Sequence, residues 1–226
     1  NGVGKTTSIG KVAASLKSAS RRGLVERFDS TVGAGSVTVP FGGRTQTTPA
    51  QSMAALLPVL PGQKTEQASV MAYGFDADQM TVDPFVGAYH SVIVSAAKLV
   101  AAGADYRKAY LTFQEFFEKL RDDHLRWGKP FAALLGALEA QMDLGAAAIR
   151  GKDPMDRDVP PTLISFAIAP VQSGEVLTPE FKSAGDPVYL FLCDGTAADQ
   201  RAVWERFHAL CCAGKVRAAW AVENSI

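Results

Sequence analysis

The chain has few cysteines, no excess of charge of either sign and no long apolar run. Its three cysteines, two of them the adjacent Cys211 and Cys212, form neither a disulfide framework nor a CxxC metal pair. The 23 basic and 23 acidic residues balance, so composition gives no attraction to nucleic acid or to a charged membrane surface. We therefore expect a cytoplasmic protein that has no nucleic-acid partner.

The sequence also lacks a candidate membrane span. Its most apolar segment, residues 92–104, is interrupted by Lys98 and is shorter than the roughly 18–20 apolar residues that a span needs. The first residues show no apolar run of the kind found in signal peptides, so we expect no membrane association. At 226 residues, of which 47% are apolar, the chain is long enough for one large domain or two modest ones.

Residues 108–170 have the pattern of a complete α/β unit. A helix is predicted over residues 130–144, with large apolar side chains at spacings of three and four that we expect to face the core: Phe131, Leu134, Leu135, Leu138 and Met142. A buried strand is predicted over residues 162–169, and the charged loop at residues 150–155 is where chemistry is expected.

Further elements follow from local patterns along the chain. Helices are predicted over residues 46–60, where Thr48-Pro49 suits a first turn, over residues 87–104 and over residues 199–213. Strands are predicted over residues 36–41, 68–75, 108–113, 162–169, 187–193 and 217–222. Residues 76–84 are predicted to form an acidic loop. Its aspartates are either solvated or bind a hard cation.

The first residues contain the end of a phosphate loop followed by an amphipathic helix. Gly4, Lys5 and Thr6 would supply backbone amides, a positive charge and a hydroxyl for Mg²⁺. The sequence NGVGKTTSIGKVAASLK resembles this part of the signal-recognition-particle receptor GTPase. The motif's first glycine would lie before Asn1, and no DxxGR-like loop or TKxD follows. Two interpretations of this segment are therefore open: a foreign helical segment without a nucleotide site, or part of a truncated GTPase.

A second resemblance extends from about Gly23 to Val222. Several blocks occur in the same order as in the second half of long-form phosphoribosylformylglycinamidine synthase: RFDSTVGAGSVTVPFGG, YLTFQEFFEKL, WGKPFAALLGALEAQ, GKD, DVPPTLISFA, LTPEFKSAG and AAWAV. That family consists of glutamine- and ATP-dependent amidotransferases of purine biosynthesis. Several blocks in one order are much more specific than any single block.

The resemblance implies an α+β fold of the aminoimidazole-ribonucleotide-synthetase type. In that family one lobe supplies a sheet that pairs with a partner sheet, and a second lobe closes over a nucleotide. We expect residues 1–22 to be a P-loop-like helical segment, residues 23–171 a synthetase-like N-lobe, and residues 172–226 the start of an incomplete α/β C-lobe. The strands up to residue 169 are expected to share one sheet with both long helices on one face.

The resemblance also implies a nucleotide site. Gly151, Lys152 and Asp153 match the family's GKDSM loop, in which lysine suits phosphate and aspartate suits magnesium. The family's serine is Pro154 here, and the stretch that follows is shortened to Asp156-Arg157, so this loop departs from the usual shape.

Two further residues of this site are implied outside the loop. Gln114 stands where related synthases carry a polar side chain at a strand end, and Asp29 belongs to the RFDST block and could face the cleft or cap a turn. A helical acid that binds magnesium in relatives would align near Val94, and valine cannot coordinate a cation.

The implied ligands are ATP or ADP with Mg²⁺, and the implied partners are the first synthetase half and the glutaminase domain. No cysteine is expected to be a glutaminase nucleophile, because Cys193 lies in a predicted strand and Cys211-Cys212 in a predicted helix. The chain is expected to be a nucleotide lobe that is inactive alone. The alternatives are the truncated GTPase and a structural module without catalysis.

If residues 1–22 are foreign to the rest, their deletion should change the free energy of unfolding by no more than about 1 kcal/mol, as for a surface segment. Thermal melting of the full and shortened chains measures this. A large fall in melting temperature would show that this segment packs on the core.

Overall fold

A computed structural model describes residues 10–11, 13–14, 19–20, 22–28, 35–152, 154–155 and 159–223. The chain divides into two compact units, Asn1–Ala34 and Gly35–Ile226. Within the first, helix α2 (Arg22–Phe28) carries an ion pair between Arg22 Nε and Glu26 Oε1 at 2.6 Å. The division into three parts at residues 22 and 171 stays a prediction.

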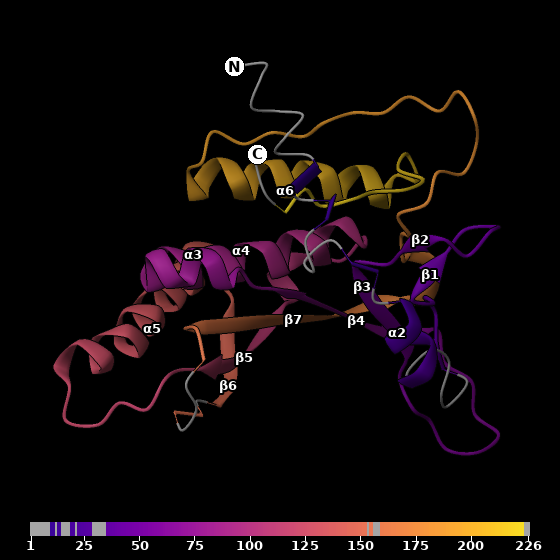
Figure 1. Ribbon diagram of the computed structural model, residues 1–226. Helices are drawn as coiled ribbons and strands as arrows, with labels where there is room; N and C mark the ends of the chain where they lie inside the picture. Colours follow the sequence, from indigo (N-terminus) through magenta and orange to yellow (C-terminus); the bar gives the residue numbers. More distant parts are fainter. Residues whose placement is uncertain are drawn as a thin grey trace. The chain divides into compact units, whose positions relative to one another are not determined.

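A five-stranded mixed sheet forms the centre of the second unit (Figure 1). Its strands lie in the order β3-β4-β7-β5-β6, with these bounds: β3 (Ser52–Leu56), β4 (Gln67–Gly74), β5 (Tyr110–Phe116), β6 (Ala147–Lys152) and β7 (Thr162–Gln172). Neighbouring strands are antiparallel except for β5 and β6, which are parallel. Two short strands, β1 (Phe41–Gly42) and β2 (Thr48–Pro49), pair separately.

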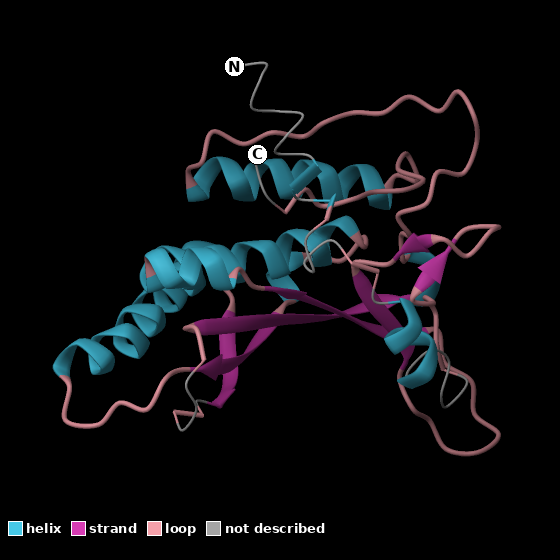
Figure 2. Cartoon of the chain, in the orientation of Figure 1, coloured by secondary structure: helices cyan, strands magenta, loops and turns pink. Residues whose placement is uncertain are grey.

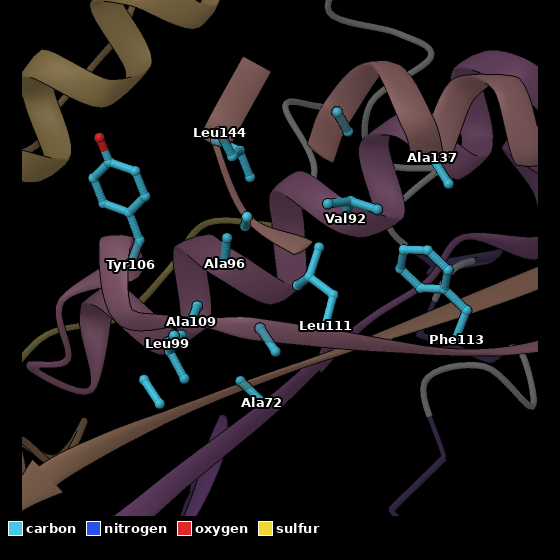
Figure 3. Close-up of a cluster of buried hydrophobic side chains, with 14 of the residues drawn as sticks. Ala72, Val92, Ala96, Leu99, Tyr106, Ala109, Leu111, Phe113, Ala137 and Leu144 are labelled. Carbon is cyan, nitrogen blue, oxygen red and sulfur yellow. The ribbon is translucent and has the colours of Figure 1, made fainter. Parts of the chain in front are cut away.

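Within the described part of the second unit, helices cover one face of this sheet and none lies on the other face (Figure 2). Their bounds are α3 (Ala77–Val82), α4 (Pro84–Ala101), α5 (His124–Leu144) and α6 (Ala197–Cys212), with short 3-10 turns η2 (Tyr106–Lys108) and η3 (Ser173–Glu175). Figure 3 shows Leu111 and Phe113 of β5 pointing toward Val92 of α4 and Ala137 of α5. The predicted α+β fold with a mixed sheet and helices on one face is confirmed.

Helix α4 is the core helix of this layer. It begins at Asp83, whose Oδ1 accepts hydrogen bonds from Phe85 N at 3.0 Å and Val86 N at 3.1 Å, with Pro84 at the first helical position. By length and composition α4 is apolar enough to cross a membrane, but half of this 18-residue stretch is buried inside the protein. Helix α6 packs on the outer side through Trp204, which meets the Tyr106 ring edge-on at 5.4 Å between centroids.

The residues predicted as an acidic loop instead contain α3. Asp76 caps this helix by accepting hydrogen bonds from Asp78 N and Gln79 N, and Asp83 caps α4. Helix capping therefore accounts for Asp76 and Asp83. Among the described residues no group of three or more His, Cys, Asp or Glu side chains could hold a metal ion.

The predicted helix is present as α5, but the prediction of which of its side chains face the core is wrong. Phe131 is 64% exposed and Met142 75% exposed, and the three leucines between them are also exposed. Most buried residues of α5 are small, among them Ala133, Gly136 and Ala137. Small side chains are needed there because α5 lies close to α4: a Cβ added at Gly136 would lie 2.0 Å from the carbonyl oxygen of Phe85.

Several predicted elements are absent from the described part of the chain. Residues 36–41 contribute one isolated bridge, Ser36 to Ala55, and the start of β1. The helix predicted over residues 46–60 is replaced by β2 and β3, because residues 52–56 pair with β4. Residues 187–193 and 217–222 are not strands. The prediction of a helix near residues 199–213 is confirmed by α6.

We expect Gly136→Ala to destabilise the protein by about 1–3 kcal/mol or more, because overpacking forces the two helices apart. Gly128→Ala in the same helix is the matched control, since a Cβ there meets nothing within 4 Å. That change should stabilise by about 0.5–1 kcal/mol through helix propensity. Urea unfolding of both variants measures the difference, and equal effects would contradict the close contact of α4 and α5.

Candidate functional site

The parallel pair β5 and β6 brings three of the predicted site residues together. Gln114 is the register partner of Lys152, and Gln114 Nε2 donates to the Lys152 carbonyl oxygen at 3.1 Å. Gly151 precedes Lys152 in β6, and both are exposed. Along β5, Leu111, Phe113 and Glu115 are buried while the alternate residues are less buried, so Gln114 lies on the sheet face without helices.

The other predicted site residues lie outside the described part of the chain. These are Asp153, Asp29 and the phosphate-loop residues Gly4, Lys5 and Thr6. The expected loop over residues 150–155 is corrected, because β6 continues through Lys152 as an edge strand. Pro154 follows, and its carbonyl oxygen accepts a hydrogen bond from Phe117 N at 3.1 Å, which holds this segment against the end of β5.

Charged side chains order the loop that follows β5. The Glu118 carboxylate pairs with Lys129 and, at 3.2 Å, with Arg126 Nη1. The hydrogen bond from Lys129 is the main cause that holds the pKa of Glu118 below its ordinary value. Trp127 Nε1 donates to the Arg121 carbonyl oxygen at 3.0 Å. These ion pairs and this hydrogen bond fix the loop between β5 and α5.

The described residues suit a phosphate better than a magnesium ion. Lys152 offers an exposed ammonium group and Gln114 an amide, whereas the described residues here supply no cluster of carboxylates. Val94 of α4 packs against the sheet: a Cβ added at Gly74 would lie 2.9 Å from Val94 Cβ. The helix position implied for a magnesium-binding acid is thus used for packing.

A second polar cluster lies beside β1 and β2, where a cavity of about 160 Å³ is lined by Thr38, Ser52, Thr178 and Glu180. Glu180 Oε2 is buried and has no hydrogen-bond partner among the described residues. It faces Gly42, since a Cβ added at Gly42 would lie 2.8 Å from this oxygen. Burial raises the pKa of Glu180, but hydrogen bonds from Lys182 and Thr178 outweigh it and hold the pKa below its ordinary value. The carboxylate is therefore ionised at neutral pH.

A third cluster surrounds a buried cation. The side chain of Lys98 in α4 is only 5% exposed, and its Nζ lies 3.0 Å from Glu223 Oε1 and 4.6 Å from the centre of the Tyr73 ring. Gln51 holds the same segment, because its side chain accepts from Ala221 N at 2.7 Å and donates to the Ala221 carbonyl oxygen at 2.8 Å. Gln51 Nε2 also donates to Glu223 Oε1 at 3.2 Å.

Sequence reasoning missed the second and third clusters. The one available signal for the third was Lys98 itself, a single charge inside an otherwise apolar helix. Such a charge needs a partner when it is buried. Its partner lies 125 positions away in the sequence, so local patterns could not identify it.

Comparison with known proteins shows the fold. No family model and no curated protein matches the chain. Among solved structures, Thermotoga maritima PurL complexed with AMPPCP is similar over 89% of this chain and 32% of that chain, with a TM-score of 0.63 and 16% identity. PurLQS from T. maritima is similar over 72% of this chain and 25% of that chain, with a TM-score of 0.59 and 18% identity.

A third solved structure, T. maritima PurL complexed with FGAR, is similar over 87% of this chain and 30% of that chain, with a TM-score of 0.59 and 18% identity. PurL from T. maritima has also been solved with ADP and with ATP. At these identities the likeness shows that the chain has the fold of a PurL-type synthetase lobe. The chain spans about a third or less of the length of these structures.

We expect Glu223→Ala to destabilise the protein by about 1–3 kcal/mol, because it leaves the buried Lys98 ammonium without a carboxylate. The double change Lys98→Met with Glu223→Ala should recover most of that loss. Asp186→Ala is the control: its partner Arg217 is 56% exposed, so its loss should cost less than about 1 kcal/mol. Chemical unfolding checks all three, and equal losses for the two single changes would contradict the burial of Lys98.

Proposed function

We propose that this chain is part of a long-form phosphoribosylformylglycinamidine synthase and forms a nucleotide-binding lobe of its second synthetase half. The observation that carries the proposal is the pairing of Gln114 with Lys152 at one sheet edge, in a lobe with the PurL fold. Seven sequence blocks in the family's order support the same conclusion. Residues 23–171 are the N-lobe in this proposal, and residues 172–226 begin the C-lobe.

The parent reaction uses ATP to activate an amide oxygen as its phosphate, which ammonia released from glutamine then displaces. This chain supplies no catalytic residue in the proposal. Lys152 binds phosphate as a point charge, Gly151 leaves space beside it, and Gln114 orients the strand end. Asp153 is the proposed magnesium ligand, and Asp29 is proposed to face the same cleft. ATP or ADP with Mg²⁺ is the proposed ligand.

The proposed partners are the first synthetase half and the glutaminase domain, in the cytoplasm. The sheet face without helices supports a partner sheet, because it carries apolar side chains such as Met71, Phe166 and Ile168. Tyr73 on this face is 49% exposed, and its ring lies 6.5 Å from that of Phe166. Two sheets pack about 10 Å apart through interdigitated apolar side chains of this kind.

We expect the isolated chain to bind Mg-ADP no tighter than about 0.1–1 mM, or about −4 to −5.5 kcal/mol. Each charge-assisted contact would contribute about 1.5–3 kcal/mol to the free energy of nucleotide binding. The shortened loop and Val94 remove contacts that would otherwise strengthen binding. Titration calorimetry with ADP, ATP and GTP measures this. Lys152→Ala should abolish the binding, whereas Lys108→Ala, an exposed lysine before the opposite end of β5, should not.

Two other outcomes would support the alternative functions. Tight GTP binding that is lost in Lys5→Ala would favour the truncated GTPase and contradict the synthase proposal. The absence of binding to any nucleotide, together with association with the first synthetase half, would favour a structural module without catalysis.

A further inference from the structure

The last turn of α6 places a thiol beside an imidazole. Cys212 Sγ lies 3.5 Å from His208 Nε2, because residues four apart share one face of a helix. Cys212 is exposed, so small molecules in solution reach its sulfur. His208 is half-buried, which restricts the positions that its ring can take.

A backbone carbonyl fixes the orientation of the His208 ring. Its Nδ1 lies 3.1 Å from the carbonyl oxygen of Gly103, just after α4. A carbonyl oxygen only accepts hydrogen bonds, so this contact assigns the proton of the neutral ring to Nδ1. The unprotonated Nε2 then faces the sulfur of Cys212. This is the geometry of a nucleophile, a base and a group that orients the base.

The residue that anchors this arrangement is a closely packed glycine. Gly103 has φ +94°, and an added Cβ there would lie 2.7 Å from the carbonyl oxygen of Glu175, so glycine is required. Nearby, Arg107 holds the pKa of Asp105 below its ordinary value, and a positive charge on His208 contributes in the same direction. A carboxylate therefore lies near the ring that would receive a proton.

We propose that Cys212 is a modification site for small disulfides, with His208 as its base and the Gly103 carbonyl as the positioning group. Cys212 Sγ forms a bond to one sulfur of the disulfide as the disulfide's own S–S bond breaks. The proton passes from Sγ to His208 Nε2 and then to the departing thiolate. The products are a mixed disulfide on Cys212 and one small thiol, so no further oxidant or reductant takes part.

This proposal is independent of the proposed synthase function, because the nucleotide-site residues take no part in it. The chain also contains its own comparison thiols. Cys193 is exposed, but its Sγ lies 3.6 Å from Gln200 Oε1 and not beside an imidazole. Cys211 is half-buried, and burial raises its pKa to about 12, so it should remain unmodified.

The test incubates the full chain with oxidised glutathione near neutral pH and follows each cysteine by mass spectrometry of its peptide. Cys212 is expected to form the mixed disulfide about tenfold or more faster than Cys193. His208→Asn keeps a side-chain N–H for the Gly103 carbonyl but removes the base. In that variant the rate at Cys212 should fall to that of Cys193, while the rate at Cys193 stays unchanged.

Equal rates at Cys212 and Cys193 in the unaltered chain would overturn the proposal, as would an unchanged rate at Cys212 in His208→Asn. If His208→Asn does not fold, the comparison within the unaltered chain decides alone, since both thiols belong to one molecule. Circular dichroism of the variant reports whether α6 is retained, which separates loss of the base from loss of the helix.

Discussion

The structure of the second unit depends on how closely α4 approaches its neighbours, and glycines set that distance. A Cβ added at Gly74 of β4 would lie 2.4 Å from the Ser91 carbonyl oxygen of α4. A Cβ added at Gly87 of α4 would lie 2.7 Å from the Met80 backbone of α3. A Cβ added at Gly136 of α5 would likewise meet the α4 backbone, at the Phe85 carbonyl oxygen. Helices and strands packed this closely leave little room between them for large side chains, so much of the core consists of alanine. The site on β5 and β6 is positioned by this core.

This constraint explains which parts of the fold the sequence could predict. The long apolar strands β4, β5 and β7 were predicted because they lie between clear turn residues. The extent of α5 was largely predicted, but its orientation was not, because hydrophobic periodicity weights large side chains whereas close packing against α4 selects small ones. The helix predicted over residues 46–60 failed because Thr48-Pro49 suits an edge strand as well as a helix start, and the pairing of residues 52–56 with β4 is not a local property.

The candidate site shows the same division between local and non-local information. Gly151, Lys152 and Gln114 were predicted from the resemblance, but their contact depends on the parallel register of two strands 38 positions apart. The cluster around Lys98 joins residues up to 172 positions apart, from Gln51 to Glu223. A sequence pattern can indicate that a charged residue is buried, but it does not identify the residue that pairs with it. The partner is identified only from the three-dimensional fold.

Residues 187–193, which were predicted as a strand, show that β-forming composition is not sufficient for a strand. Val188 is 75% exposed and Tyr189 76% exposed, and no described strand pairs with this segment. It is held to α6 by the Phe191 ring, which meets Phe207 edge-on at 5.5 Å between centroids. Backbone groups without a neighbouring strand stay hydrated, and the segment has no regular secondary structure. Together with the open sheet face and the outer face of α5, it leaves apolar surface that favours coverage by further protein. That surface is the physical argument for a larger assembly, and it is independent of any sequence resemblance.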